Sequence, residues 1–350
     1  MGKLKGSKIT KGISQYSFIL VFFVIFIIYV ITSNGLTWSG MMNVLRHSAV
    51  IGVIGIGMGL VCLTGAIDLS VGSMLALVSG FSVMVFNATG NILVTLLFAI
   101  LFGAVLGLLN GVLVGVAKMP SFIVTLATML IFRSLAQYVC QRVPKDLIGG
   151  GSSVYRMDSS IDAYSSFYSF GNGTLATIPI VGILLIVFTA LFVFVANNTK
   201  YGKKIYAVGS NEKAAHMAGI NVSMIQTSVF VLTGILVGMA AFLWIGMNAS
   251  SDPATTGNSY EMYAIAAVVL GGISMAGGKG RVIGILFGAM SYTVIDKIIV
   301  ALKMDSLIND TIKGTILIIV ILIQVAGPQI KAFINSRRLA HVNKAGNTKE

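Results

Sequence analysis

Long apolar runs separated by short polar segments dominate the 350 residues of the chain. A helix needs roughly 20 apolar residues to cross the hydrocarbon core of a bilayer, or about 17 to 25 with tilt. Ten runs come near that length, at 17–33, 48–64, 71–87, 92–116, 121–139, 180–196, 224–248, 261–275, 282–301 and 309–327. The pattern predicts an all-α, polytopic membrane helix bundle over 17–327, with about ten transmembrane helices and tails at 1–16 and 328–350.

Two of these runs are broken by polar and glycine residues. Asp68 stands between Gly65 and Ser70 at the start of the third run. A carboxylate within a bilayer is costly unless it has a partner or faces a cavity. A glycine-rich interruption between Gly271 and Gly280 follows in the second half. Because broken helices line the transport path in many transporters, the pair predicts re-entrant segments and an internal repeat.

Composition excludes a water-soluble fold, since 56% of the residues are hydrophobic and only 10% are charged, against about a quarter in soluble domains. The formal charge of +13 would fit a nucleic-acid-binding protein if the basic residues formed a patch. They lie instead between the apolar runs and at the two ends, where they act as topology signals. We therefore expect membrane lipid and no nucleic acid as a partner.

The basic residues also predict the orientation of the chain. With the amino terminus inside, the inner segments hold 16 Lys and Arg, the outer loops 5 and the spans 3. Cytoplasmic loops carry such an excess. Both terminal tails, 1–16 and 328–350, are therefore predicted to be cytoplasmic, as is the loop 197–223. The first apolar run lacks a small-residue cleavage site, so we interpret it as an uncleaved span.

The inner loop 197–223 predicts a short helix. Ser210 suits an N-cap, Glu212 suits the first turn of a helix dipole, and Gly219 suits the C-terminal stop. A helix of about eight residues is marginal in water without packing. The prediction is thus a helix that docks on another protein, and the alternative is an amphipathic segment lying on anionic lipid.

The docking surface is expected to be small and close-fitting, because Ala214, Met217 and Ala218 share one side of the helix. The residues assigned to it are Gly209, Ser210, Asn211, Glu212, Ala214, Ala215, Met217, Ala218 and Gly219.

The run from Gly202 to Ile220 is similar to the cytoplasmic coupling loop of the ribose, xylose and galactose type permeases of ABC importers. Three other segments resemble the same family in the same order. They are Gly65–Gly72, then Gly107–Gly111 leading to Pro120–Thr128, and finally Tyr260–Gly272 with Gly277, Gly278 and Gly280 behind it. Ala66, Ala127 and Tyr263 depart from the family pattern, and these departures bear on the substrate rather than on the fold.

The resemblance implies the permease subunit of an ATP-driven importer that carries a monosaccharide across the bacterial cytoplasmic membrane. It further implies a separate ATPase subunit that binds ATP, an extracytoplasmic sugar-binding protein, and a second permease that is either identical or homologous. The chain itself is expected to hold no cofactor and to be no enzyme. Its Gly277–Gly280 segment lacks the spacing and the hydroxyl of a P-loop, and the sequence contains no hydrolase motif.

Polar residues within or beside the spans are the candidates for the substrate pathway, namely Asp68, Ser70, Asn110, Thr125, Thr128, Glu261 and Ser274. The structural alternative is that Asp68 caps a helix and that the others bond between helices, on the order of 0.6 kcal/mol each. Three functional alternatives also stay open: an ABC permease for a nucleoside or signalling sugar, an ion-coupled secondary transporter, and a membrane enzyme or scaffold.

Overall fold

The computed structural model describes residues 17–304 apart from 34, 36, 151 and 152, together with a few positions between 308 and 322. The chain divides into two units, 1–301 and 302–350, of which the first contains the helix bundle. Of the predicted tenth span, 309–327, only 311–316, 318, 319 and 322 are described, all as helix. The two tails, 1–16 and 328–350, lie outside the described residues.

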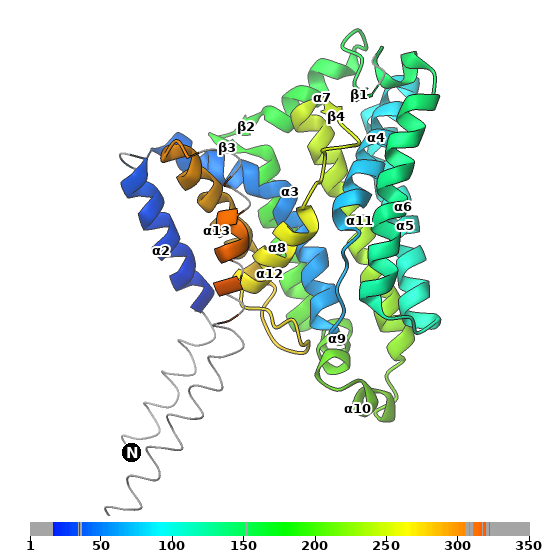
Figure 1. Cartoon of the computed structure of the whole chain (residues 1–350), viewed down its shortest axis with the longest axis vertical. Helices are drawn as coiled ribbons and strands as arrows, with labels where there is room; N and C mark the ends of the chain where they lie inside the picture. The colour runs from blue at the N-terminus through cyan, green and yellow to red at the C-terminus, as the bar shows by residue number, and fades with distance from the viewer. Residues whose placement is uncertain are drawn as a thin grey trace, which may run out of the picture. The chain divides into compact units, whose positions relative to one another are not determined.

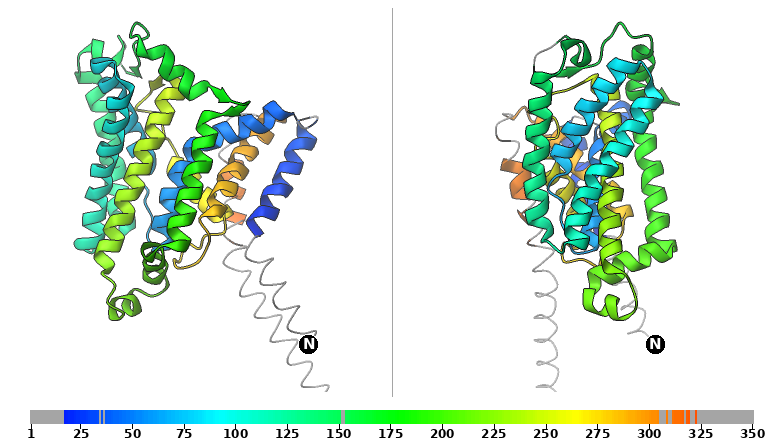
Figure 2. Two further views of the ribbon diagram at one scale, coloured as in Figure 1. Left: turned by 180° about the vertical axis from the view of Figure 1, so that it is seen from behind. Right: turned by 90° about the vertical axis from the view of Figure 1, so that its right-hand side faces the viewer.

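Helices make up nearly all of the described chain (Figures 1 and 2), which confirms the all-α prediction. Seven helices are long and apolar enough to cross a membrane: α3 (Trp38–Leu63), α4 (Val71–Thr89), α5 (Ile92–Gly111) continued by η1 (Val112–Val116), α6 (Ser121–Arg142), α8 (Ile180–Asn198), α11 (Val222–Asn248) and α13 (Ile283–Ala301). Further α-helices in the described part of 1–301 are α2 (Ser17–Thr32), α7 (Ala163–Asn172), α9 (Lys200–Ser210), α10 (Glu212–Met217) and α12 (Tyr260–Leu270).

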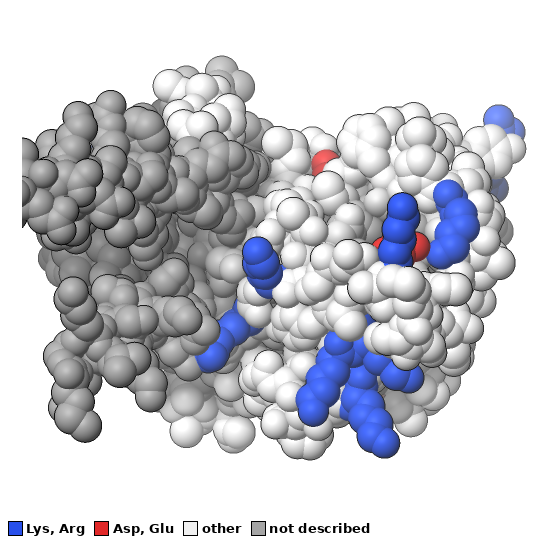
Figure 3. Space-filling model, turned by 90° about the horizontal axis from the view of Figure 1, so that it is seen from below, with Lys and Arg blue, Asp and Glu red and all other residues white. Residues whose placement is uncertain are grey.

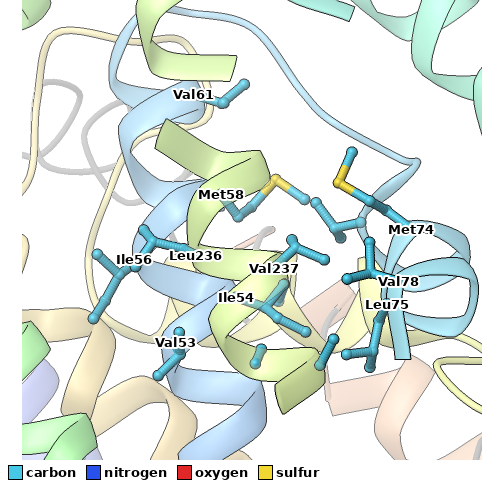
Figure 4. Close-up of a cluster of buried hydrophobic side chains, with 14 of the residues drawn as sticks. Val53, Ile54, Ile56, Met58, Val61, Met74, Leu75, Val78, Leu236 and Val237 are labelled. Carbon is cyan, nitrogen blue, oxygen red and sulfur yellow. The ribbon is translucent and has the colours of Figure 1, made fainter. Parts of the chain in front are cut away.

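Helix α3 runs through the centre of the unit, with every residue from Ser48 to Leu63 buried. A helix that is apolar all round belongs inside a large core. Figure 4 shows its side chains packed against those of α4 and α11. The predicted start at 48 was wrong. The helix begins at Trp38, where Thr37 caps it through Gly40 N–H, so the polar pair Arg46 and His47 lies within the helix.

Helices α5 and α11 approach each other through glycines spaced four residues apart. A Cβ atom added to Gly103 would lie 2.2 Å from the carbonyl oxygen of Gly234, and one added to Gly107 would lie 2.4 Å from that of Phe230. Without a hydrophobic driving force between helices in lipid, close backbone packing of this kind holds bundles together. These glycines of the apolar runs therefore form a helix–helix interface.

Two spans are discontinuous. A coil at 64–70 leads from α3 into α4, and a second coil at 252–259 leads into α12, whose 11 residues cover about 16 Å. The second coil meets the first turn of α4, where the backbones of Gly72 and Gly257 touch. The first break lies where the sequence predicted it, between Gly65 and Ser70, whereas the predicted second interruption at Gly271–Gly280 is the loop between α12 and α13. The predicted eighth span at 261–275 was wrong, because α12 ends at Leu270 and the coil before it was missed. The internal repeat stays a prediction.

The loop between α6 and α8, predicted to lie on the outer side, is folded rather than irregular. It contains the 3-10 helix η2 (Lys145–Ile148), α7, and the strands β1 (Tyr155–Arg156), β2 (Thr174–Leu175) and β3 (Ile178–Pro179). β1 pairs antiparallel with β4 (Ser250–Ser251), and β2 with β3. The hydroxyl of Tyr155 donates to the carbonyl of Ala136 at 2.7 Å. The loop therefore closes over α4, α6 and α11.

We expect Gly234→Leu to lower the thermal stability of the purified protein. Its Cβ would lie 2.1 Å from the Gly103 carbonyl oxygen, so α5 and α11 must separate, at a cost of about 1 to 3 kcal/mol. Thermal denaturation in detergent measures this as a fall in Tm. The matched substitution Ile235→Leu, one residue further along α11, should leave Tm unchanged. Equal Tm values for the two variants would contradict the interface.

Candidate translocation pathway and docking surface

The broken segment before α4 is organised by Asp68. Its Oδ1 accepts hydrogen bonds from the N–H of Ser70 at 2.9 Å and from the Ser70 hydroxyl at 2.6 Å. The Asn110 side-chain amide on α5 donates to the same hydroxyl at 2.8 Å. All three side chains are buried. Three predicted pathway residues are therefore brought together, and Asp68 fixes the backbone of Ser70, the residue just before α4.

Helix α6 holds the same coil from the other side. The N–H of Leu69 donates to Thr125 Oγ1 at 3.0 Å, and the N–H of Ile67 donates to Ser121 Oγ at 3.3 Å. Thr128 is buried and donates to the carbonyls of its own helix. Non-helical backbone at membrane depth needs partners of this kind. The structural alternative thus accounts for these contacts, and a role of these residues in transport stays a prediction.

Two buried oxygens of this cluster, Asp68 Oδ2 and Asn110 Oδ1, make no hydrogen bond with the described residues. Buried side-chain acceptors usually have a partner. These two oxygens make the interior next to α4 unusually polar for a membrane bundle.

Glu261 lies at a second polar point, on the first turn of α12. A Cβ added to Gly72 would lie 2.5 Å from Glu261 Oε2, so the carboxylate touches the start of α4. Arg133 of α6 donates to the carbonyls of Pro253 and Thr256 at 3.0 and 2.6 Å. From the sequence, Arg133 was counted only as a residue within a span. Its signal was an isolated arginine inside an apolar run, which marks functional positions in membranes.

Ser274 does not join either polar point. It lies in the loop after α12, where its N–H donates to the carbonyl of Lys279 at 2.9 Å. Its hydroxyl accepts from the N–H of Ala276. The predicted pathway residues therefore separate into the Asp68 cluster, Glu261 beside α4, and Ser274 in the loop after α12.

The predicted docking helix exists as α10, but its N-cap was predicted wrongly. Ser210 is the last residue of α9, and Asn211 caps α10 by accepting from the N–H of Ala214 at 2.9 Å. An amide side chain at this position competes well with serine for the cap. Gly219, at φ +78°, follows the helix as predicted.

The faces of α10 divide between packing and exposure. Ala215 is buried, while Ala214 and Ala218 are exposed and Met217 is 81% exposed. A groove of about 1220 Å³ adjoins the helix and reaches Lys118 in the loop before α6. Exposed apolar side chains beside a groove are typical of protein contacts. Ala214, Met217 and Ala218 thus form an outward face, and Ala215 is an anchor rather than a contact residue.

Basic side chains surround α10 at this end of the unit, which Figure 3 shows from below. Lys118 pairs with Glu212 at 3.7 Å, and both side chains are about half exposed. An ion pair this open contributes little to stability. Its structural effect is to join the α5–α6 loop to the first turn of α10.

A glycine junction, formed by Gly209, Gly277 and Gly278, connects the base of α10 with the end of α3. The N–H of Gly278 donates to the carbonyl of Leu63 at 2.9 Å. A Cβ added to Gly209 would lie 1.8 Å from the same oxygen. The end of α3, the end of α9 and the loop after α12, which are far apart in sequence, therefore touch through their backbones. Leu63, at this contact, lies five residues before Asp68.

Tyr206 fastens the same junction. Its hydroxyl donates to the carbonyl of Gly280 at 3.0 Å. Burial raises the pKa of Tyr206 above its ordinary value, so the hydroxyl keeps its proton at neutral pH. Helix α9 is thereby bound to the loop after α12 by a side chain as well as by the backbone.

Comparison with known proteins gives a consistent family. The chain is 35% identical over 306 residues to a ribose import permease of Bacillus subtilis (strain 168), covering 87% of this chain and 91% of the relative. It is 34% identical over 315 residues to a ribose import permease of Escherichia coli (strain K12), covering 88% and 92%. An autoinducer 2 import system permease of Yersinia pseudotuberculosis serotype O:3 (strain YPIII) is 30% identical over 266 residues, covering 76% and 71%.

No solved structure gave a significant match. The family model described as "Branched-chain amino acid transport system / permease component" matches residues 40–322, which include both broken segments, the glycine junction and α10. The chain therefore belongs to the branched-chain amino acid transport system permease component family, as a multi-pass membrane transport protein rather than an enzyme.

Proposed function

We propose that this chain is the permease subunit of an ATP-driven importer for a monosaccharide of the ribose type. The observation that carries the proposal is α10, a short helix with an exposed face that directly follows α9, whose Gly209 lies against the Leu63 carbonyl at the end of α3. Relatives named as ribose import permeases, aligned over most of the chain, supply the substrate class.

The distribution of charge supports a cytoplasmic position for α10. Around it lie seven basic residues and one acidic residue, Glu212; the basic ones are Lys118, Lys200, Lys203, Lys204, Lys213, Lys279 and Arg281. At the opposite end of the unit 1–301, the described loops and helix ends carry four basic and three acidic residues, namely Arg46, Arg142, Lys145 and Arg156 with Asp146, Asp158 and Asp162. Cytoplasmic segments carry the basic excess. Helix α2 begins at the basic end (Figure 1), which supports an amino terminus on the same side.

A second copy, or a homologous permease, is proposed to cover the exposed coil at 252–259. Thr255 and Asn258 are exposed in this coil, which descends from Ser251 beside Ser79 to Gly257 beside Gly72. These contacts place it about 15 to 26 Å below the outer end of α4. Irregular backbone at that depth is tolerated only where protein covers it or a water-filled cavity adjoins it. A paired permease supplies both conditions.

In this scheme a separate ATPase binds ATP and docks on α10, and an extracytoplasmic sugar-binding protein delivers the solute to the outer end. Closure of the ATPase displaces α10, and the glycine junction passes the displacement to the end of α3. Docking shifts the bundle between its states only if the ATPase contacts differ between them. This arrangement requires no ATP-binding site in the chain itself.

The second candidate is a permease for another hydroxylated solute. It is favoured by the relative named for autoinducer 2 import, which is 30% identical to this chain. An ion-coupled secondary transporter has weaker support, because the described spans hold few ionisable residues outside the Arg133–Glu261 region.

Uptake into vesicles tests the proposed function directly. The chain, reconstituted with its ATPase and binding protein, should take up D-ribose only with ATP at the cytoplasmic face, and uptake should survive collapse of proton and sodium gradients. Uptake of D-galactose and adenosine, measured in parallel, separates the substrate candidates. Gradient-driven uptake by the chain alone would overturn the proposal in favour of a secondary transporter.

Truncation of Met217 should weaken docking of the ATPase. Met217→Ala removes the most exposed apolar side chain of α10, and loss of a central contact of this kind costs about tenfold or more in affinity. Met224→Ala, which truncates another exposed methionine, on α11 outside the docking face, is the matched control. Affinities measured by pull-down or biolayer interferometry that are equal for both variants would contradict the assignment.

Gly209→Ala should uncouple ATP hydrolysis from transport. Its Cβ would lie 1.8 Å from the Leu63 carbonyl oxygen, so α9 must move away from the end of α3 while the face of α10 stays intact. We expect the ATPase to bind and hydrolyse ATP but uptake per ATP to fall by about tenfold. Gly314→Ala is the control, since no atom lies near its added Cβ and its backbone is helical. Normal coupling in Gly209→Ala would exclude the junction as the connection.

A further inference from the structure

A small polar recess opens between the outer half of α6 and the turn at 252–254. Its volume is about 280 Å³, just below the range of ligand pockets, ~300 to 1,000 Å³. Its polar side chains are Gln137, Gln141, Ser153 and Asp252. None of them was among the pathway residues expected from the sequence, and all are accessible, in contrast to the buried Asp68 cluster.

The hydrogen-bonding capacity of this recess is largely unused. Asp252 Oδ1 accepts from the N–H of Ala254 at 2.8 Å, while its second oxygen makes no hydrogen bond with the described residues. The side-chain amides of Gln137 and Gln141 likewise make none within the described part of the chain. A carboxylate oxygen and two amides together offer both acceptors and donors. This is the set that a solute with several hydroxyl groups satisfies.

The depth of Gln137 makes its free amide informative. It lies five residues before Arg142 at the outer end of α6, or about 8 Å below that end. An unpaired amide in contact with hydrocarbon is unfavourable. The other side of α6 carries Ile131, Leu135 and Tyr138, each about half exposed. One side of the helix therefore suits lipid, and the side that bears Gln137 suits water.

Arg133 fixes the wall of the recess from below. Its guanidinium donates to the carbonyls of Pro253 and Thr256, and Asp252 N–H donates to Thr256 Oγ1 at 3.1 Å. The turn that presents Asp252 is therefore held in one geometry against α6. A rigid wall with free acceptors and donors is what a specific polar contact requires.

We propose that this recess is the outward-facing solute subsite of the permease, in which Asp252, Gln137 and Gln141 bind the hydroxyl groups of a monosaccharide. The inference rests on the proposed function and names where the solute first contacts this chain. Arg133 is a positioning residue in this site, because it acts through the backbone of 253–256.

Cysteine labelling tests the subsite in the complete transporter in nanodiscs. The native Cys62 and Cys140 are buried, so their background reaction with a membrane-impermeant maleimide is low. Gln137→Cys should be labelled from the outer side, and excess D-ribose, D-galactose or adenosine, whichever is transported, should slow labelling by about fivefold or more. The matched control Leu135→Cys, on the lipid side of α6, should stay unlabelled.

Transport kinetics supply the second readout. Asp252→Asn and Gln141→Met should raise the KM for uptake by about tenfold each, the effect of removing a hydrogen bond from a charged or buried polar partner. The exposed outer-loop substitution Asp162→Asn is the control and should leave KM unchanged. ATPase association, which depends on α10, should stay normal in all three variants.

The outcomes separate the subsite from the function. If the wild-type transporter shows no ATP-driven uptake, the proposed function is wrong. Labelling of Gln137→Cys, and its protection by solute, still test the recess in that case. Labelling that no solute slows, or no labelling at all, overturns the subsite even if ATP-driven uptake is intact. Equal labelling of Leu135→Cys also overturns it, because the two sides of α6 would then share one environment.

Discussion

The need to satisfy every polar backbone group within the bilayer is the constraint on which this structure depends. Two spans are broken at mid-depth, and each break exposes N–H and C=O groups that lipid cannot bind. The first break is satisfied by the side chains of Asp68, Ser121 and Thr125. The second is held by Arg133 through two carbonyls. Helix α6 contributes to both, so this single helix stabilises the two irregular segments together.

Close backbone packing also satisfies polar backbone groups at the end of the bundle that carries α9 and α10. At the glycine junction, the carbonyl of Leu63 receives the N–H of Gly278 and lies directly against Gly209. No side chain separates the three segments, so a displacement of α9 reaches the end of α3 without an intervening flexible group. In the proposed function, docking on α10 and the arrangement near Asp68 are therefore coupled rather than independent.

Much of this architecture was predictable from the pattern of apolar runs. The limits of α4, α8 and α13 fall close to the predicted ones, because long apolar helices with glycine or polar ends carry a strong signal. The start of α3 was missed because Arg46 and His47 interrupt the apolar run, although the helix continues through both residues. The coil before α12 was missed because Asp252–Ser259 is ordinary loop sequence whose depth depends on tertiary contacts. Polar residues within the apolar runs predicted the Asp68 cluster. The sequence could not show that these side chains are buried, or that Gln137 and Asp252 are accessible, because both depend on how α6 packs against its neighbours.

The glycine row between α5 and α11 limits how the molecule can change shape. With backbone atoms already in contact at Gly103 and Gly234, sliding or rotation of one helix against the other would drive backbone atoms into each other. We therefore expect α5 and α11 to move as a unit. In the proposed transport cycle, a change between outward and inward access would then have to rearrange other elements around this pair.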